Sequence, residues 1–321
     1  MGTEFKIPIL FYYIKKFLFM LPCSREFRMI DLHTHSTASD GTCTPSQLIS
    51  YAAEKNVSVI ALTDHDNLDG ILEAQSKAKE LGIEFIPGIE ISIEWPSGEF
   101  HLLGLGLKKA GKKLLETIEF LKSERDSRNK KIIQKLSEQN INISYEELIE
   151  KAGTKTIGRP HFAKLLMEKG IIKKTQQAFD LFFAKGRPCY VSKTGENLKK
   201  AVEAIKESGG IPVQAHPMSM YVSWGKMEET MLEIKKAGVE GLEAHHPGIR
   251  LSEARRLEEL AQVLGMFTTA GSDFHGEKVR ADRKIGHSSG GYKIEDKFWT
   301  EQLKPALEKI HGGADHTFSA V

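Results

Sequence analysis

The sequence predicts an α/β fold, a TIM-like barrel of β/α units that a mostly helical segment interrupts. Short apolar runs rich in β-branched residues recur along the chain, and most segments between them carry apolar residues at helical spacings of three and four. Several runs stop at a histidine or a carboxylate. Because parallel strands of a barrel end at one face, where barrel enzymes place their chemistry, we expect these side chains to converge.

The first strand is expected over residues 29–32, and it leads into two histidines. His33 and His35 are two residues apart, so the strand period of two points both imidazoles the same way. Asp40 adds a carboxylate from a loop of small polar residues. These groups suit zinc, iron or manganese, although a strand with two structural histidines would give the same short pattern.

The same arrangement recurs at later apolar runs, and this recurrence favours a metal site. The runs and the polar residues after them are 57–63 with Asp64, His65 and Asp66, 83–88 with Glu90, 210–215 with His216, 239–244 with His245 and His246, and 266–271 with Asp273 and His275. A turn at 95–98 joins the strand ending near Ile93 to a strand over 100–107 that carries His101. A core histidine and a ligand are both open there, and we favour the ligand.

Capping residues predict the first helices. Thr44 as N-cap and Pro45 in the first turn start a helix that extends to about Lys55. A second helix is expected over 67–81, with Gly82 ending it. A last helix is expected near 299–310.

Residues 108–195 break the strand rhythm and are expected to form a helical insertion that acts as a substrate wall or lid. Its expected helices are 112–140, 145–152, 161–169 and 175–184, and we interpret the charged run 122–131 as a solvated helix face. The remaining divisions are a barrel over 29–107 and 196–310, a loose tail over 311–321, and residues 1–28 as an N-terminal extension or an artefact of cloning or start-site choice.

One segment of the insertion has the features of a phosphate site. Pro160 suits the first turn of a helix, so Arg159 and His161 would flank a helix N-terminus, where anions bind well. An ordinary capped helix start explains the same residues equally well.

Composition narrows the class of protein. The 321 residues include 45 basic and 43 acidic residues, a net charge of +2, so neither nucleic acid nor an anionic membrane is required as a partner. Cys23, Cys43 and Cys189 are scattered and odd in number, which favours a reducing cytoplasm over a disulfide framework. The apolar stretch 7–21 is short and broken by two lysines, so no membrane span is expected.

Six motifs in chain order resemble those of the PHP (polymerase and histidinol phosphatase) phosphoesterases. They are Asp31-Leu-His-Thr-His-Ser, Thr63-Asp-His-Asp, Pro87-Gly-Ile-Glu, the His-x-x-Gly at His101, Ala215-His-Pro and Gly271-Ser-Asp-Phe-His. The resemblance covers residues 29 to about 290. With its helical insertion carrying Gly158-Arg-Pro-His, the chain is most similar to the nucleoside 3′,5′-bisphosphate phosphatases and the related 5′-to-3′ oligoribonucleotidases.

The resemblance implies a distorted seven-stranded β/α barrel that holds two or three divalent metal ions, commonly manganese, iron or zinc. Carried over by position, it implies a first metal held by His33, His35, Glu90 and Asp273, a second held by Glu90 as a bridge with His101 and His216, and a third held by Asp40, His65 and His275. A hydroxide shared by bridged metals would attack phosphorus. Arg159 is the expected phosphate clamp, and His161, His245 and His246 are expected to bind the phosphate or to protonate the leaving oxygen.

The implied activity is hydrolysis of a nucleotide phosphate monoester, the 3′-phosphate of a nucleoside 3′,5′-bisphosphate or the phosphate of a mononucleotide. A 5′-to-3′ exoribonuclease acting on short RNA shares the same site. A histidinol phosphate phosphatase and a catalytically silent PHP module are two further alternatives. Intact ligand positions disfavour the silent module, and no obligate protein partner is inferred.

Overall fold

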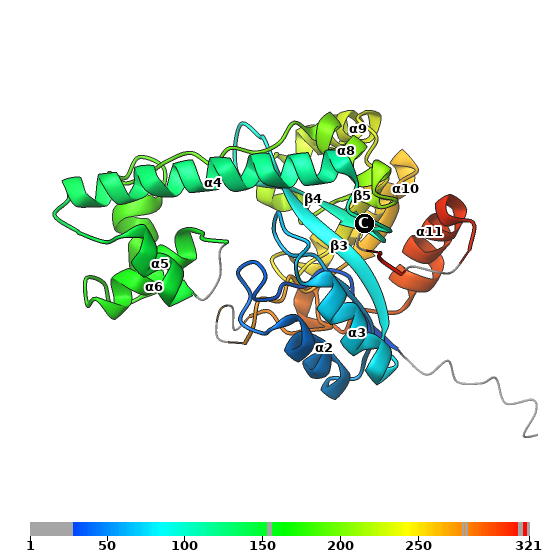
Figure 1. Cartoon of the computed structure of the whole chain (residues 1–321). Helices are drawn as coiled ribbons and strands as arrows, with labels where there is room; N and C mark the ends of the chain where they lie inside the picture. Colours follow the sequence, from blue (N-terminus) through cyan, green and yellow to red (C-terminus); the bar gives the residue numbers. More distant parts are fainter. Residues whose placement is uncertain (1–27, 153–155, 278, 280–281, 314–316, 320–321) are drawn as a thin grey trace, which may run out of the picture.

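Seven strands form the centre of the molecule (Figure 1), and the computed structural model describes residues 28–152, 156–277, 279, 282–313 and 317–319. The strands are β1 Met29–Asp31, β2 Val57–Leu62, β3 Glu84–Ile93, β4 Phe100–Leu105, β5 Ile211–Gln214, β6 Gly241–His245 and β7 Phe267–Ala270, and they lie side by side in chain order. Past the end strands, the Leu32 amide donates to the Ala270 carbonyl at 3.3 Å and Thr34 bridges to Phe274. The sheet therefore closes into the expected barrel.

The third and fourth strands form a hairpin. As expected, β3 ends at Ile93, so it runs through Glu90, and it pairs with β4 in the antiparallel direction. β4 is antiparallel to β5 as well, whereas the other neighbouring strands are parallel. Since β4 runs in the opposite direction, His101 near its start lies at the same end of the barrel as residues that follow the parallel strands.

Helices cover the outside and one end of the barrel. They are α2 Pro45–Glu54, α3 Ile71–Leu81, α8 Leu198–Glu207, α9 Trp224–Lys236, α10 Leu251–Leu264 and α11 Lys304–His311, with shorter turns η2 Pro217–Met220, η3 Ser289–Gly291 and η4 Phe298–Leu303. Thr44 is the N-cap of α2, as predicted, and it also forms a reciprocal capping box with Gln47. The helix expected from residue 67 begins only at Ile71, because the Asn67 side chain accepts the Asp69 amide at 2.9 Å and so forms a turn.

Alternate residues of the strands pack on opposite sides of the sheet. Ile30 and Val59 belong to the cluster that also contains Trp299 and Leu307 of η4 and α11, whereas Ile60 packs with α2 and α3. The first cluster fills the barrel interior, and η4 with α11 closes one end of the barrel. The polar residues of the site follow the strands at the opposite end.

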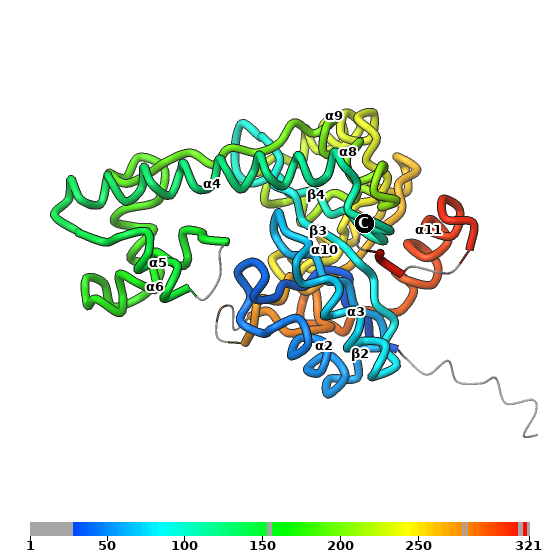
Figure 2. Tube along the Cα trace, viewed as in Figure 1, coloured from blue at the N-terminus to red at the C-terminus, as the bar shows by residue number. Residues whose placement is uncertain are grey.

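The insertion consists of α4 Lys112–Glu138, α5 Tyr145–Ala152, α6 Arg159–Glu168, α7 Thr175–Ala178 and the π-helical turn η1 Phe179–Phe183, close to the expected helices. The first half of α4 packs on the barrel through Leu114 and Ile118, but its second half joins a separate core with Phe162 and Phe183. Figure 2 follows the chain out along α4, through α5 and α6, and back to α8. The insertion thus has its own core at the end of a long helix rooted on the barrel.

The tail is not loose where the structure describes it. Phe318 is buried, its amide donates to Gln75 at 2.7 Å, and the Ser319 amide donates to the Lys108 carbonyl at 2.9 Å. Cys43 and Cys189 are unpaired, whereas Cys23 and residues 1–27 of the expected extension lie outside the described residues. Within the part of the chain that the structure describes, no helix is long and apolar enough to cross a membrane.

Candidate metal centre and phosphate cleft

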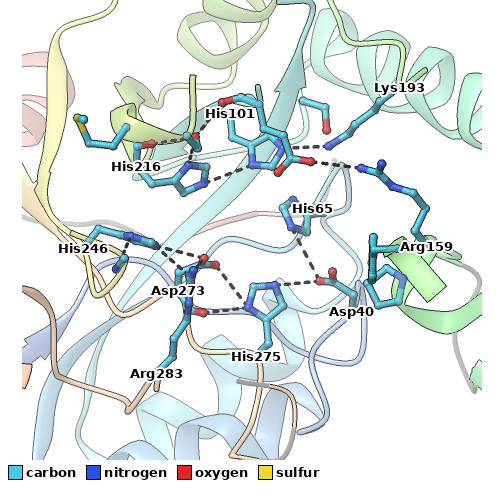
Figure 3. Close-up of a pocket in the computed structure, with 18 of the residues that line it drawn as sticks. Asp40, His65, His101, Arg159, Lys193, His216, His246, Asp273, His275 and Arg283 are labelled. Carbon is cyan, nitrogen blue, oxygen red and sulfur yellow. Dashed lines mark hydrogen bonds and ion pairs between the residues drawn. The ribbon is translucent and has the colours of Figure 1, made fainter. Parts of the chain in front are cut away.

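Histidines and carboxylates on or next to six of the seven strands meet at one end of the barrel, and Figure 3 shows part of this cluster. Three groups each offer one nitrogen or oxygen per residue with all such atoms within 4.8 Å of one another, and they are His33, His35, Glu90 and Asp273, then His35, Asp40, His65 and His275, and finally His65, Glu90 and His101. His216 joins the last group through Glu90. All nine residues expected as ligands are therefore brought together.

Glu90 lies at the centre of this cluster, between two sets of imidazoles. Its Oε1 is 2.9 Å from both His101 Nδ1 and His216 Nε2. Its Oε2 is 3.3 Å from both His33 Nε2 and His35 Nε2. One oxygen for each set is the arrangement that a bridging carboxylate requires.

Several buried atoms of the cluster have no hydrogen-bond partner that suits them. His33 Nε2 and His35 Nε2 face each other at 3.1 Å, and Glu90 Oε2 is buried beside them without a hydrogen bond from any described residue. Buried polar atoms are normally paired, so these converging nitrogen and oxygen atoms indicate a site suited to a cation. Nitrogen and oxygen donors without a thiolate fit divalent ions of the manganese, iron or zinc type.

Electrostatics place two imidazoles and the central carboxylate in the protonation states that bind metal, but not His33. Burial alone would lower the pKa of His33, whereas the carboxylates of Glu243 and Glu90 raise it to about 10, so a metal ion would have to displace its proton. Burial, with His275 and His65 nearby, lowers the pKa of His35 to about 3, and burial beside Lys193 lowers the pKa of His101 to about 4. Burial alone would raise the pKa of Glu90, but the surrounding histidines hold it well below its usual value. At neutral pH the two imidazoles are neutral and the carboxylate is ionised, as ligands must be.

Asp40, His65 and His275 form the second part of the cluster. His275 Nε2 is 3.3 Å from Asp40 Oδ1, and His65 Nε2 is 3.9 Å from the same oxygen.

Two other residues of the cluster have an unusual backbone conformation. Asp273 and His216 adopt positive φ angles of 50° and 25°, which are rare for residues other than glycine. Such outliers cluster at functional sites, where the surrounding structure holds them in place.

Three buried carboxylates that sequence reasoning gave no role orient this cluster. Glu243 of β6 lies 3.0 Å from His33 Nδ1 and accepts the His216 amide at 2.7 Å. Asp64 accepts hydrogen bonds from the Ser36 amide and hydroxyl at 2.8 and 2.7 Å. Asp31 accepts the amides of Ser272 and Gly286 at 2.9 and 2.7 Å and so holds the chain beside Asp273. Asp31 and Asp64 belong to the motifs, which was the signal available for them.

A cleft of about 530 Å³ separates the cluster from the insertion. Asp40, His65, His101, His216, Asp273 and His275 line its barrel side, and Arg125, Arg128, Arg159, Phe179 and Lys193 line the side of the insertion. Arg125 forms an ion pair with Asp66, and Arg159 Nη2 lies 3.3 Å from Glu99 Oε1. Lys193 Nζ lies 2.9 Å from His101 Nε2. The cleft therefore has a cation-binding side and a cationic side.

Of the residues expected to bind substrate, some line the cleft and others do not. Arg159 and His246 line the cleft, and His246 Nε2 lies 3.3 Å from Asp273 Oδ2 and 2.9 Å from Arg283 Nη1. His161 is not among the residues that line the cleft, and its Nδ1 accepts the Gly158 amide at 3.0 Å as a helix cap.

His245 is a correction to the expected catalytic set. Its Nε2 lies 3.3 Å from Glu258 of α10 and its ring packs 5.0 Å from that of Phe298, away from the cleft. Successive residues at a strand end point to opposite sides, so His245 and His246 do not both face the site. His245 is therefore not a candidate for catalysis or for substrate binding.

A β/α barrel that gathers this many imidazoles and carboxylates at its strand ends defines a metal-dependent hydrolase. A family model described as PHP domain matches residues 31–209. The chain belongs to the PHP domain family, and within it to the metal-dependent phosphoesterases.

Individual relatives cover most of the chain. The chain is 33% identical over 245 residues to a 5′-3′ exoribonuclease of Haemophilus influenzae, an alignment that spans 76% of this chain and 89% of the relative. It is 31% identical over 282 residues to a 3′,5′-nucleoside bisphosphate phosphatase of Chromobacterium violaceum, spanning 86% of this chain and 99% of the relative.

Solved structures agree with this placement. An amidohydrolase of Chromobacterium violaceum with bound sulfate and no metal has a TM-score of 0.76 and 31% identity, covering 88% of this chain and 96% of its own. A protein of Bifidobacterium adolescentis described as a metal-dependent phosphoesterase has a TM-score of 0.75 and 26% identity, covering 86% and 96%.

Proposed function

We propose that the protein hydrolyses the 3′-phosphate of a nucleoside 3′,5′-bisphosphate. The observation that carries this proposal is the two-sided cleft, in which a cluster suited to metal ions faces a wall of arginine and lysine side chains from the insertion. A nucleotide with phosphates at both ends of its ribose can place one at each side. A monoester without a second anion would leave the cationic wall unused.

We assign the nine converging residues as ligands of two or three divalent ions of manganese, iron or zinc. His33, His35, Glu90 and Asp273 would hold the first, Glu90, His101 and His216 the second, and Asp40, His65 and His275 the third. When bound, such ions supply Lewis acidity toward a phosphate oxygen and lower the pKa of water toward neutrality.

The other residues of the chain would position and balance charge. Glu243 holds His33 in one orientation and tautomer by accepting from its outer nitrogen. Arg159 would bind a phosphate oxygen from the insertion once it leaves Glu99. His246, beside Asp273 and Arg283, is our candidate for contact with the reacting phosphate or the leaving oxygen. His161 would act indirectly by capping the helix that carries Arg159.

The proposal includes the domain division, with residues 29–107 and 196–310 as the barrel and 108–195 as the substrate wall. Support comes from the separate core of the insertion and from the cationic side chains that it contributes to the cleft. The unpaired thiols of Cys43 and Cys189 fit the reducing cytoplasm that we propose as the location.

The second candidate is a 5′-3′ exoribonuclease on short RNA, which the relative from Haemophilus influenzae favours by its name. Both activities would use the same cluster and differ in the leaving group. Phosphate release should therefore be measured from a panel of adenosine 3′,5′-bisphosphate, mononucleotides, histidinol phosphate and short 5′-phosphorylated RNAs. The highest kcat/KM for the bisphosphate supports the first proposal. Mononucleotide release from the RNAs with little turnover of the bisphosphate would replace it by the second.

A further inference from the structure

Arg128 is a buried cation of the cleft without an ion-pair partner among the described residues. It lies on α4 and lines the cleft, yet the residue is only 8% exposed. Its Nε is a buried donor without an acceptor, and no described residue forms an ion pair with its guanidinium. Burial, together with Arg159 and Arg125, lowers the pKa of Arg128 to about 10, so the group stays charged at neutral pH.

The other cations of the cleft are each engaged. Arg125 pairs with Asp66, Arg159 with Glu99, Arg283 with Asp273, and Lys193 hydrogen-bonds to His101. A charge removed from water without a partner is unfavourable, and proteins rarely keep one without a use for it. Arg128 is therefore the cation of the cleft at which an incoming anion gains most, because no existing ion pair has to be broken.

The position of Arg128 is fixed from two directions. It follows Arg125 by three residues, so both lie on one face of α4, and the Arg125 pair with Asp66 ties that face to the barrel. The next residue, Asn129, is buried and donates to the Ile157 carbonyl at 3.0 Å, just before the helix that carries Arg159. Arg128 is thus held between the barrel and α6 before any ligand arrives.

We propose that Arg128 binds the non-reacting phosphate of the substrate, at the side of the cleft opposite the candidate metal centre. A guanidinium matches a phosphate with two parallel hydrogen bonds. The two carboxylates that act on Arg128, Asp66 and Glu99, are already paired with Arg125 and Arg159. The inference rests on the proposed function and deepens it, because it names the group that would select bisphosphates over monophosphates. Arg159 would assist only after exchanging Glu99 for the phosphate.

Selectivity tests the proposal directly. Arg128→Gln and Arg128→Lys should be compared with Lys130→Gln, which removes an exposed charge two residues further along α4. With adenosine 3′,5′-bisphosphate, Arg128→Gln should lower kcat/KM by about tenfold to a thousandfold, mainly through KM. With adenosine 3′-monophosphate, which has no second phosphate, it should change little, and Lys130→Gln should change neither. Equal losses for both nucleotides would overturn the proposal.

Thermal stability separates binding from a structural role. Removing an unpaired buried charge should leave the nucleotide-free melting temperature of Arg128→Gln unchanged or higher. An arginine that held the fold together would give a lower one. Arg128 would be structural if Arg128→Gln melts at a lower temperature and loses activity toward both nucleotides, and if Arg128→Lys restores both activities.

A binding measurement decides the question even if the proposed function fails. Calorimetry should compare adenosine 5′-monophosphate binding to the full chain loaded with manganese and to its Arg128→Gln variant. We expect binding at least about tenfold weaker in the variant. If the wild type releases phosphate from neither nucleotide, the proposed function is wrong, but weaker binding would still support an anion site at Arg128. Equal affinity would overturn it.

Discussion

Some residues of the site could be predicted from their neighbours in the sequence, and others could not. His33, His35 and Asp273 follow apolar runs, so their position at strand ends could be predicted. Glu243 could not, because it lies inside a buried run and its partner His33 is 210 residues away in the chain. The role of a single carboxylate within a strand becomes visible only when the positions of the other strands are known.

Glu243→Gln tests that positioning role. The substitution replaces a charged acceptor beside His33 Nδ1 by a neutral amide. It should weaken metal binding by about tenfold to a hundredfold, as loss of a carboxylate that orients a histidine ligand typically does. Metal content after dialysis and activity at rising manganese concentration measure this. Glu240→Gln, at an exposed carboxylate before the same strand, is the control. Unchanged metal retention in Glu243→Gln would show that His33 is oriented without it.

Arg159→Ala should weaken turnover of the bisphosphate without changing metal content. Loss of one or two charge-assisted hydrogen bonds corresponds to about tenfold to ten-thousandfold in kcat/KM, and release from Glu99 places the expected value near the lower end. A small ester such as p-nitrophenyl phosphate should lose less. Lys164→Ala, exposed on the same helix, is the control. Equal losses for the two substrates would place Arg159 at the reacting phosphate.

Individual helices and strands could be predicted where capping and periodicity agree, as for α2. The charged run 122–131 shows the limit of that approach. Its solvated-face interpretation is wrong for Arg128 and Asn129, which are both buried. Burial there comes from the barrel and from the segment before α6, which a periodicity argument confined to one helix does not include. For the same reason the antiparallel course of β4 was not foreseen.

The insertion should be separable from the metal centre by a core substitution. Phe162 is fully buried among the insertion helices, so Phe162→Ala should lower the free energy of unfolding of that core by about 3 to 5 kcal/mol. The variant should keep its metal content and lose bisphosphate turnover, since the barrel ligands lie outside this core. Leu181→Ala, at an exposed position of the insertion, is the control. Loss of metal together with activity would contradict a separate role for the insertion.

The whole molecule should respond to acid through its buried imidazoles. Because the pKa values of His35 and His101 are about 3 and 4 in the fold, the unfolded chain binds more protons below the ordinary histidine value of about 6.5. Unfolding therefore takes up protons, and stability of the metal-depleted protein should fall as pH drops from about 6.5 toward 4. Melting temperatures across this range measure the effect, and His35→Asn should flatten it. An equally steep fall in His35→Asn would assign the acid sensitivity to other groups.

The central claim is metal-dependent removal of the 3′-phosphate, and one measurement tests it most directly. Phosphate release from adenosine 3′,5′-bisphosphate and metal content should be followed in the same sample of the full chain before chelation, after it, and after manganese is restored. The account predicts that release stops when metal is removed, returns with it, and leaves adenosine 5′-monophosphate as product. Release at the full rate from exhaustively metal-depleted protein, or adenosine 3′-monophosphate as the product, would contradict it.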